Sequence, residues 1–184
     1  MHAFPCGTSA LDFVGTLRAR RNDVPTEKLG SPEALDAWFL EAGLMDRSPR
    51  ATTADLEKAV ELREAVYRVV HARMMGAPLA EDDLRVLNSH AAGRPITLQL
   101  DESGTIDRAA DIAEGLSQIA RQTVEIVGGT EGDVLRECGR PECTQVYLDH
   151  SRGHRREWCS MKTCGNRMKA TAFRARQKQP AATA

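Results

Sequence analysis

Four of the five cysteines lie in two pairs near the C-terminal end of the chain, and both pairs have the same spacing. Four residues separate the members of each pair, and fifteen residues lie between the pairs. Each pair can bring two thiolates to one ion, and four thiolates at about 2.3 Å complete the tetrahedral coordination of structural zinc. The spacing therefore predicts one structural Zn²⁺ ion without a catalytic position, held by Cys138, Cys143, Cys159 and Cys164.

Two disulfides or four buried free thiols would have the same spacing. The N-terminus lacks the charged and apolar regions of a secretory signal, so we expect a cytoplasmic, reducing environment, which favours metal binding. His150 and His154 lie between the pairs and could each replace a cysteine as a ligand, although we expect them in a loop at a hairpin tip. Cys6 stands alone, and we expect no nucleophilic or redox role for it.

Positive charge is concentrated around these cysteines. The segment 136–178 holds eleven Lys or Arg and four acidic residues, a net charge of +7, whereas the remainder carries −8. An acidic body with a basic C-terminal arm is typical of a protein that meets a polyanion. The alternative is a solvated surface that pairs with the acidic body. The predicted nucleic-acid-binding residues are Arg152, Arg155, Arg156, Asn166, Arg167, Lys169, Arg174, Arg176 and Lys178.

The elements that would position these residues can be read around the cysteines. Strand propensity at 146–148, a turn at Gly153 and a returning segment at 157–158 predict a hairpin between the pairs. A helix at 161–178, ended by Pro180, would carry the last ligand in its first turn, which is the order of a treble-clef finger. At 100° per residue this helix has an apolar stripe, expected to pack on the metal site, with cations on both flanks. The stripe residues are Met161, Cys164, Met168, Ala172 and Ala175.

The pattern CGxxECxxVYLDxSRxxxRxWCSMxxCGNRxKAxxFRxR, at 138–176, resembles the CGNR-type zinc finger of bacterial proteins described as stress-induced transcription regulators. In that family the finger follows an α/β, ligand-sensor-like domain called ABATE. Its marks here are LDFVGT at 11–16, WFLEAGLM at 38–45 and ELREAVYRVV at 61–70. The family often has Asn at the position of Gly15, so a role of that Asn in binding or capping is in doubt here. The resemblance implies a DNA-binding regulator.

Hydrophobic periodicity and cap residues predict an α+β fold for the N-terminal part. A strand is expected at 11–17 and a β-hairpin at 96–110. Arg63 falls on an apolar helix face, where a paired structural arginine is the favoured interpretation over a ligand anchor. The four predicted helices lie at 31–43, 53–75, 79–92 and 109–127. We expect two domains: an ABATE-like α/β domain at 1–133 that senses a ligand or dimerises, and a CGNR treble-clef finger at 134–180.

Taken together, these patterns predict a zinc-finger transcription regulator that binds double-stranded DNA. Its acidic N-terminal domain would sense a small molecule or form a homodimer, and no membrane contact is expected. The alternative is a zinc-stabilised module that binds RNA or protein. No enzyme motif is found, and a nuclease using His150, His154 or Asn166 is the least favoured alternative. Phe173, off the apolar stripe, is expected to contact the N-terminal domain rather than a nucleic-acid base or sugar.

Overall fold

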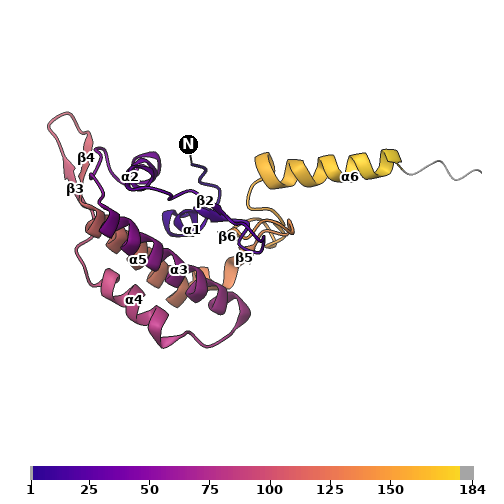
Figure 1. The fold of residues 1–184 in the computed structure, drawn as a ribbon, viewed down its shortest axis with the longest axis horizontal. Helices are drawn as coiled ribbons and strands as arrows, with labels where there is room; N and C mark the ends of the chain where they lie inside the picture. Colours follow the sequence, from indigo (N-terminus) through magenta and orange to yellow (C-terminus); the bar gives the residue numbers. More distant parts are fainter. Residues whose placement is uncertain (1, 179–184) are drawn as a thin grey trace, which may run out of the picture.

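The computed structural model describes residues 2–178, in which helices are combined with three short antiparallel hairpins (Figure 1). The helices are α1 (Ser9–Val14), α2 (Pro32–Glu41), α3 (Thr53–Met75), α4 (Glu81–Ala91), α5 (Ile112–Gly128) and α6 (Asn166–Lys178). The strands are β1 (Leu17–Arg18), β2 (Thr26–Glu27), β3 (Thr97–Leu100), β4 (Ile106–Ala109), β5 (Leu135–Glu137) and β6 (Val146–Leu148). A 3₁₀ turn, η1 (Thr130–Val134), precedes β5, and a π-helical turn, η2 (Met161–Gly165), leads into α6. The predicted α+β class is confirmed. Pro180 lies outside the described residues.

The N-terminal core forms around α3, which contacts α1, α2, α4 and α5. Three aromatic rings fill its centre. Trp38 of α2 packs edge-on against Phe13 of α1 and against its own neighbour Phe39, with ring centroids 4.9 and 5.2 Å apart. All three rings are buried, so α1 and α2 are fixed to each other by aromatic packing.

Cap residues set the helix ends as the sequence predicts. Ser31 accepts from the N–H of Ala34 at the start of α2, and Thr52 forms a capping box with Asp55 at the start of α3. Gly76 ends α3 with φ of 63°, a left-handed conformation that glycine adopts at little cost. Helix α5 begins later than predicted, at Ile112, because Asp111 caps it.

The LDFVGT segment is a helix, so the predicted strand at 11–17 is wrong. Thr8 caps α1 by accepting from the N–H of Leu11 at 3.3 Å, and Gly15 ends it. Every residue from 10 to 14 is buried. A short helix that is buried on all sides has no clear periodicity to distinguish it from a buried strand, and this explains the error.

The finger's β-hairpin also differs from the predicted one. Strand β6 pairs with β5, in the register Leu135↔Leu148 and Glu137↔Val146, and residues 157–158 form no strand. The first cysteine pair lies in the loop of this hairpin. The segment at 157–158 is held instead by a hydrogen bond of 2.8 Å, which the N–H of Gly139 donates to the carbonyl of Glu157.

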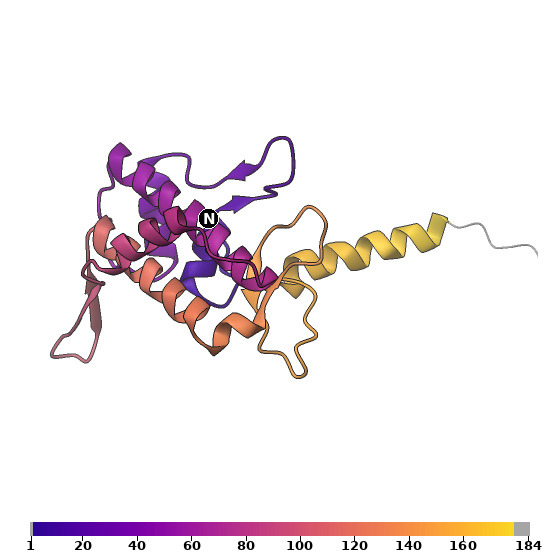
Figure 2. The same cartoon turned by 90° about the horizontal axis from the view of Figure 1, so that it is seen from below.

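The finger is packed on the N-terminal part. Strand β5 contacts α3, β6 contacts α1, and one hydrophobic cluster continues from Leu11 to Val146 and Tyr147. The opposite ends project: α6 extends beyond the finger, and the β3–β4 hairpin extends from the far side of the molecule (Figures 1 and 2). Within the described residues, no helix has the length and apolar composition that crossing a membrane requires.

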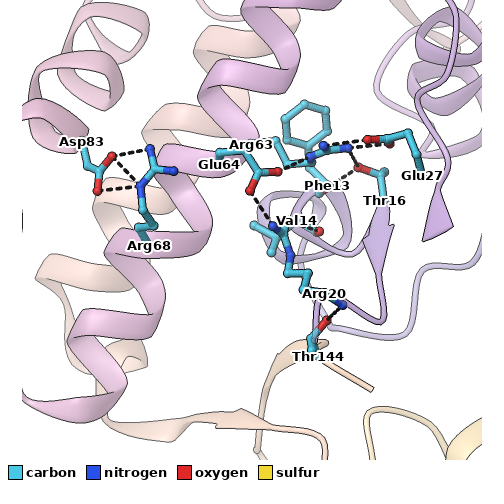
Figure 3. Close-up of polar contacts among 10 residues, drawn as sticks. All are labelled: Phe13, Val14, Thr16, Arg20, Glu27, Arg63, Glu64, Arg68, Asp83 and Thr144. Atoms are coloured by element: carbon cyan, nitrogen blue, oxygen red, sulfur yellow. Dashed lines mark hydrogen bonds and ion pairs between the residues drawn. The ribbon is translucent and has the colours of Figure 1, made fainter. Parts of the chain in front are cut away.

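Arg63 is a paired structural arginine, as the favoured interpretation predicts. Its guanidinium, 2 % exposed, donates to both oxygens of Glu27 at 2.6 and 2.8 Å and to Glu64 at 2.9 Å (Figure 3). Glu64 also accepts from Arg20 at 2.5 Å, and the backbone N–H of Arg20 donates to Thr144 of the finger at 3.3 Å. These ion pairs fasten the β1–β2 hairpin to α3.

Candidate zinc centre and nucleic-acid interface

The four predicted ligands come together in one cluster. Their Sγ atoms all lie within 4.8 Å of one another. The Sγ atom of Cys159 is 3.9 Å from that of Cys143 and 3.7 Å from that of Cys164. Zn–S bonds of about 2.3 Å in a tetrahedron place the sulfurs about 3.8 Å apart. The same distances are far too long for a disulfide bond, so the cluster fits one zinc ion and not two disulfides.

Short hydrogen bonds shape the loop that carries the first pair. The N–H of Cys138 donates to the carbonyl of Gln145 at 3.0 Å, and the N–H of Cys143 donates to that of Arg140 at 2.8 Å. The second pair closes around Gly165, where a Cβ atom would lie 2.7 Å from Sδ of Met161 and 3.1 Å from Trp158. A side chain at this position would have to displace the end of Met161 and would press against the indole, which favours glycine.

Hydrogen bonds within the cluster shift the pKa values of its thiols in opposite directions. Hydrogen bonds from Cys143 and then Cys159 hold the pKa of Cys138 far below its usual value. The hydrogen bonds to Cys138 in turn raise the pKa of Cys143 and of Cys159, to about 12 for Cys143. Four thiolates this close together repel one another, so a divalent cation between them is needed to keep all four ionised. Arg140, whose Nη1 is 4.0 Å from Sγ of Cys164, adds a positive charge beside the cluster.

The side chain of Arg156 is held by contacts within the protein. Its guanidinium lies 4.4 Å from the centroid of the Tyr147 ring and donates to the carbonyls of Pro5, at 3.1 Å, Trp158, at 2.8 Å, and Cys159. Tyr147 in turn donates to the carbonyl of Arg156. These contacts give Arg156 a structural role, and its predicted contact with phosphate stays a prediction.

The histidines lie in the loop between the cysteine pairs, as expected, and not in the thiolate cluster. His150 contacts Glu131 at 2.9 Å, and Nδ1 of His154 is 2.7 Å from the carbonyl oxygen of Asp149. Asp149 is buried and also accepts from the N–H groups of Ser151 and Arg156, at 2.9 and 3.0 Å. The loop is therefore built around one buried carboxylate.

The other predicted nucleic-acid-binding residues face solvent. Helix α6 is 13 residues long, which corresponds to about 20 Å, and it extends past the finger in both views (Figures 1 and 2). Lys178 ends the helix, and its side chain lies outside the described residues. The exposed residues are Arg152, Arg155, Asn166, Arg167, Lys169, Arg174 and Arg176.

The apolar stripe, which runs from η2 into α6, packs only at Cys164 and Met168, and Met161 at its start is 49 % exposed. Cys164 is buried and Met168 is half-buried, but Ala172 and Ala175 are exposed. The prediction that the whole stripe packs on the metal site is wrong, because the helix is longer than the finger beneath it. Phe173 is 56 % exposed on the projecting part of α6, so the expected contact with the N-terminal domain is wrong as well (Figure 1).

The residues that connect the two parts of the chain were not predicted from the sequence. Gln145 of the finger donates to the carbonyl of Gly15 at 3.3 Å, and the N–H of Leu148 donates to the carbonyl of Cys6 at 3.2 Å. Two cations of the N-terminal part, Arg18 and Lys28, line a cleft together with residues of the finger and were not predicted either. No sequence signal marks them, since they belong to the part of the chain that is acidic on average.

A helical domain joined to a small four-cysteine zinc finger is the class of protein that this architecture defines. Residues 7–130 match the ABATE family, described as "Putative stress-induced transcription regulator", and residues 135–177 match the CGNR zinc finger. The chain therefore belongs to the ABATE family, and its four-cysteine cluster is the metal site of a CGNR zinc finger that takes one zinc ion. No protein of curated function matches the sequence.

Proposed function

We propose that the protein is a transcription regulator that binds double-stranded DNA through α6 and the loop at 151–155. The observation that carries this proposal is the set of exposed cations on a helix that projects from the molecule with little of its surface covered. A regulator-type family and a zinc finger in one chain support the same role. The single zinc ion, held by the four cysteines, would fix the start of α6.

The arrangement of side chains around α6 suits the major groove. At 100° per residue, Arg167 and Arg174 lie on one flank, and Lys169 and Arg176 lie on the opposite flank. The major groove, about 12 Å wide, admits one helix between two phosphate backbones. Cations on opposite flanks of an inserted helix would each reach one backbone.

The face between these flanks, away from Met168 and the finger, is the one that would meet base edges. It carries Asn166, Phe173 and Gln177. Amide side chains can form two hydrogen bonds with adenine, and an aromatic ring can contact the thymine methyl group. We assign these three residues to base contacts and the flanking cations to phosphate contacts.

We propose a separate role for each of the two segments of the chain. The N-terminal segment 1–133 would sense a small molecule or mediate a homodimer, and 134–180 would be the DNA-binding finger, in a cytoplasmic protein. The finger is proposed to have no enzymatic role, because four thiolates fill the zinc coordination and leave no position for a catalytic water.

The test is duplex binding by the zinc-loaded full chain across a series of salt concentrations. Each phosphate contact contributes a slope of about 0.9 in the logarithm of the binding constant against the logarithm of salt. The double variant Arg174→Gln/Arg176→Gln should bind all duplexes more weakly and lose roughly two units of slope. The matched control is Arg85→Gln/Arg94→Gln, which removes two exposed cations from the helical domain. Equal duplex affinity of the two double variants would exclude α6 as the DNA-binding element, and tighter binding to single-stranded RNA would favour an RNA-binding module.

A further inference from the structure

A cleft of about 660 Å³ opens between the helical domain and the finger. Arg18 and Lys28 of the β1–β2 hairpin region line one wall, and Lys162 and Arg167 of the finger line another. Residues 3–5, at the N-terminal end, add an apolar surface to the cleft, and the side chain of Phe4 among them is 37 % exposed. The volume is typical of sites for small organic ligands, and such sites often lie between domains.

The cleft holds more positive charge than its surroundings neutralise. Among the described residues, no carboxylate lies within 4.0 Å of any of these four cations, whereas a fifth, Arg140, is paired with Glu142 at 2.8 Å. Four thiolates and one Zn²⁺ ion have a net charge of −2, which would offset two of the cations on the finger side. Arg18 and Lys28 remain, on the wall without metal ligands. Arg18 lies near Asp12, whose carboxylate offsets part of its charge, and the Nε of Arg18 donates to the carbonyl of Gly15 at 3.4 Å.

The wall that carries Arg18 and Lys28 is held firmly in place. The doubly hydrogen-bonded pair of Arg63 and Glu27 fixes β2 directly before Lys28 (Figure 3). Ala19, which follows Arg18 and also lines the cleft, has φ of 53°. A left-handed conformation is unfavourable for a non-glycine residue, and strained residues concentrate at binding sites. The hairpin thus holds Arg18 and Lys28 in a fixed part of the cleft wall.

We propose that this cleft binds a small molecule with at least two clustered negative charges, phosphate or carboxylate, and an apolar or aromatic part that contacts Phe4. The charges would bridge Arg18 and Lys28 to Lys162 and Arg167. This site would give the sensing role of the proposed regulator a location between the two domains. The effect of the bound ligand on DNA binding rests on the proposed function. The binding of the ligand to the cleft does not.

The ligand would oppose DNA binding. Arg167 lines the cleft and is also one of the cations assigned to the DNA backbone. An anion that holds Arg167 within the cleft would compete with a phosphate of the duplex for the same guanidinium. By linkage, duplex DNA would weaken the binding of the anion by the same factor.

The test is calorimetric titration of the zinc-loaded full chain with three probes: pyrophosphate, citrate and ATP. These probes separate charge alone, carboxylate chemistry, and charge combined with an aromatic ring. We expect binding of at least one probe at one site per chain, and about tenfold weaker binding by Arg18→Gln/Lys28→Gln. The control Arg85→Gln/Arg94→Gln should bind like the wild type. Absence of heat with all three probes, or an equal loss of affinity in the control, would overturn the proposal.

Duplex binding by the same variants distinguishes this proposal from the proposed function. Arg18→Gln/Lys28→Gln should keep its duplex affinity, and Arg174→Gln/Arg176→Gln should keep its affinity for the anion. If the first variant loses duplex affinity as strongly as the second, the cleft is part of the DNA surface and the proposal fails while the function stands. If the wild type binds the anion at this cleft but no duplex, the function fails and the anion site stands.

Discussion

The side-chain amide of Gln145, in the finger, donates a hydrogen bond of 3.3 Å to the carbonyl of Gly15, the residue that ends α1. Gln145 is buried, and its Oε1 also lies 3.5 Å from the thiol of Cys6. A Cβ atom at Gly15 would lie 2.7 Å from Nε2 of Gln145. The absence of a side chain at position 15 therefore lets the finger dock on the helical domain in this way.

Gly15→Ala should destabilise the protein mainly through a clash with Gln145, with a second tight contact to the carbonyl oxygen of Asp12 at 3.2 Å. Gly15 has φ of −68°, which alanine adopts readily, so without the clash the change would be neutral or slightly stabilising. Overpacking a buried amide should reduce the free energy of unfolding by about 1–3 kcal/mol. Urea unfolding of Gly15→Ala, Gln145→Ala and the double variant measures the coupling. Additive effects would show that the two residues do not interact.

Zinc removal should unfold the finger before the helical domain. We expect about one zinc ion per chain by elemental analysis, and less than one after Cys164→Ser, because only four thiolates complete the site. A chelator should reduce the helical signal in circular dichroism and expose amides of 134–178 to hydrogen exchange, since a metal site contributes much of the folding free energy of so small a module. Unchanged exchange in this segment would contradict a structural role for zinc. The metal site could be predicted because its four ligands lie close together in the sequence, as two cysteine pairs separated by fifteen residues.

The docking of the finger and the cleft could not be predicted in this way. They depend on residues far apart in the chain, such as Arg18 and Lys162, whose charges carry no information about their distance in space. Likewise, composition alone cannot separate a guanidinium that faces solvent from one that, like Arg156, is surrounded by backbone carbonyls. The strand predicted for α1 failed for a related reason, since burial on every side removes the periodicity that identifies an element.

Asp12 gives the protein a pH dependence of opposite sign to that of a surface carboxylate. Burial raises its pKa from 3.8 to about 6, against the hydrogen bonds from Cys6 and the charge of Arg18. Between these values the folded state holds a proton that the unfolded state releases, so the contribution of Asp12 to stability is full below about pH 4 and is lost as the pH rises through 6. The free energy of unfolding of the wild type relative to Asp12→Asn should fall by about 2 kcal/mol between pH 4.5 and 7.5. A pH-independent difference between the two proteins would show that Asp12 has an ordinary pKa.

Arg156→Lys should reduce the stability of the protein, whereas Arg155→Gln should reduce its duplex binding. Lysine cannot reproduce the planar stacking on Tyr147 or the several hydrogen bonds of Arg156, so Arg156→Lys should lower the free energy of unfolding by about 2 kcal/mol or more. Arg155 is exposed, and its replacement should leave stability nearly unchanged and weaken duplex binding. Thermal unfolding and duplex titration of both variants check this contrast. If Arg156→Lys is as stable as the wild type, the internal role of Arg156 is refuted.

Phe173→Ala should change which sequences the protein prefers without changing its fold. The ring is 56 % exposed on α6, between the two cationic flanks, so the protein gains little stability from it. Bound to DNA, it would lie against base edges, where a thymine methyl group is its apolar partner. Duplexes selected from a random pool by the wild type should show a thymine preference at one position that Phe173→Ala loses, while both proteins have the same salt dependence. The matched control is Thr171→Ala, which removes a small exposed side chain from the same helix and should leave the selected sequence unchanged. If Phe173→Ala selects the same sequence as the wild type, Phe173 makes no base contact, and the reading face of α6 has to be assigned to other residues.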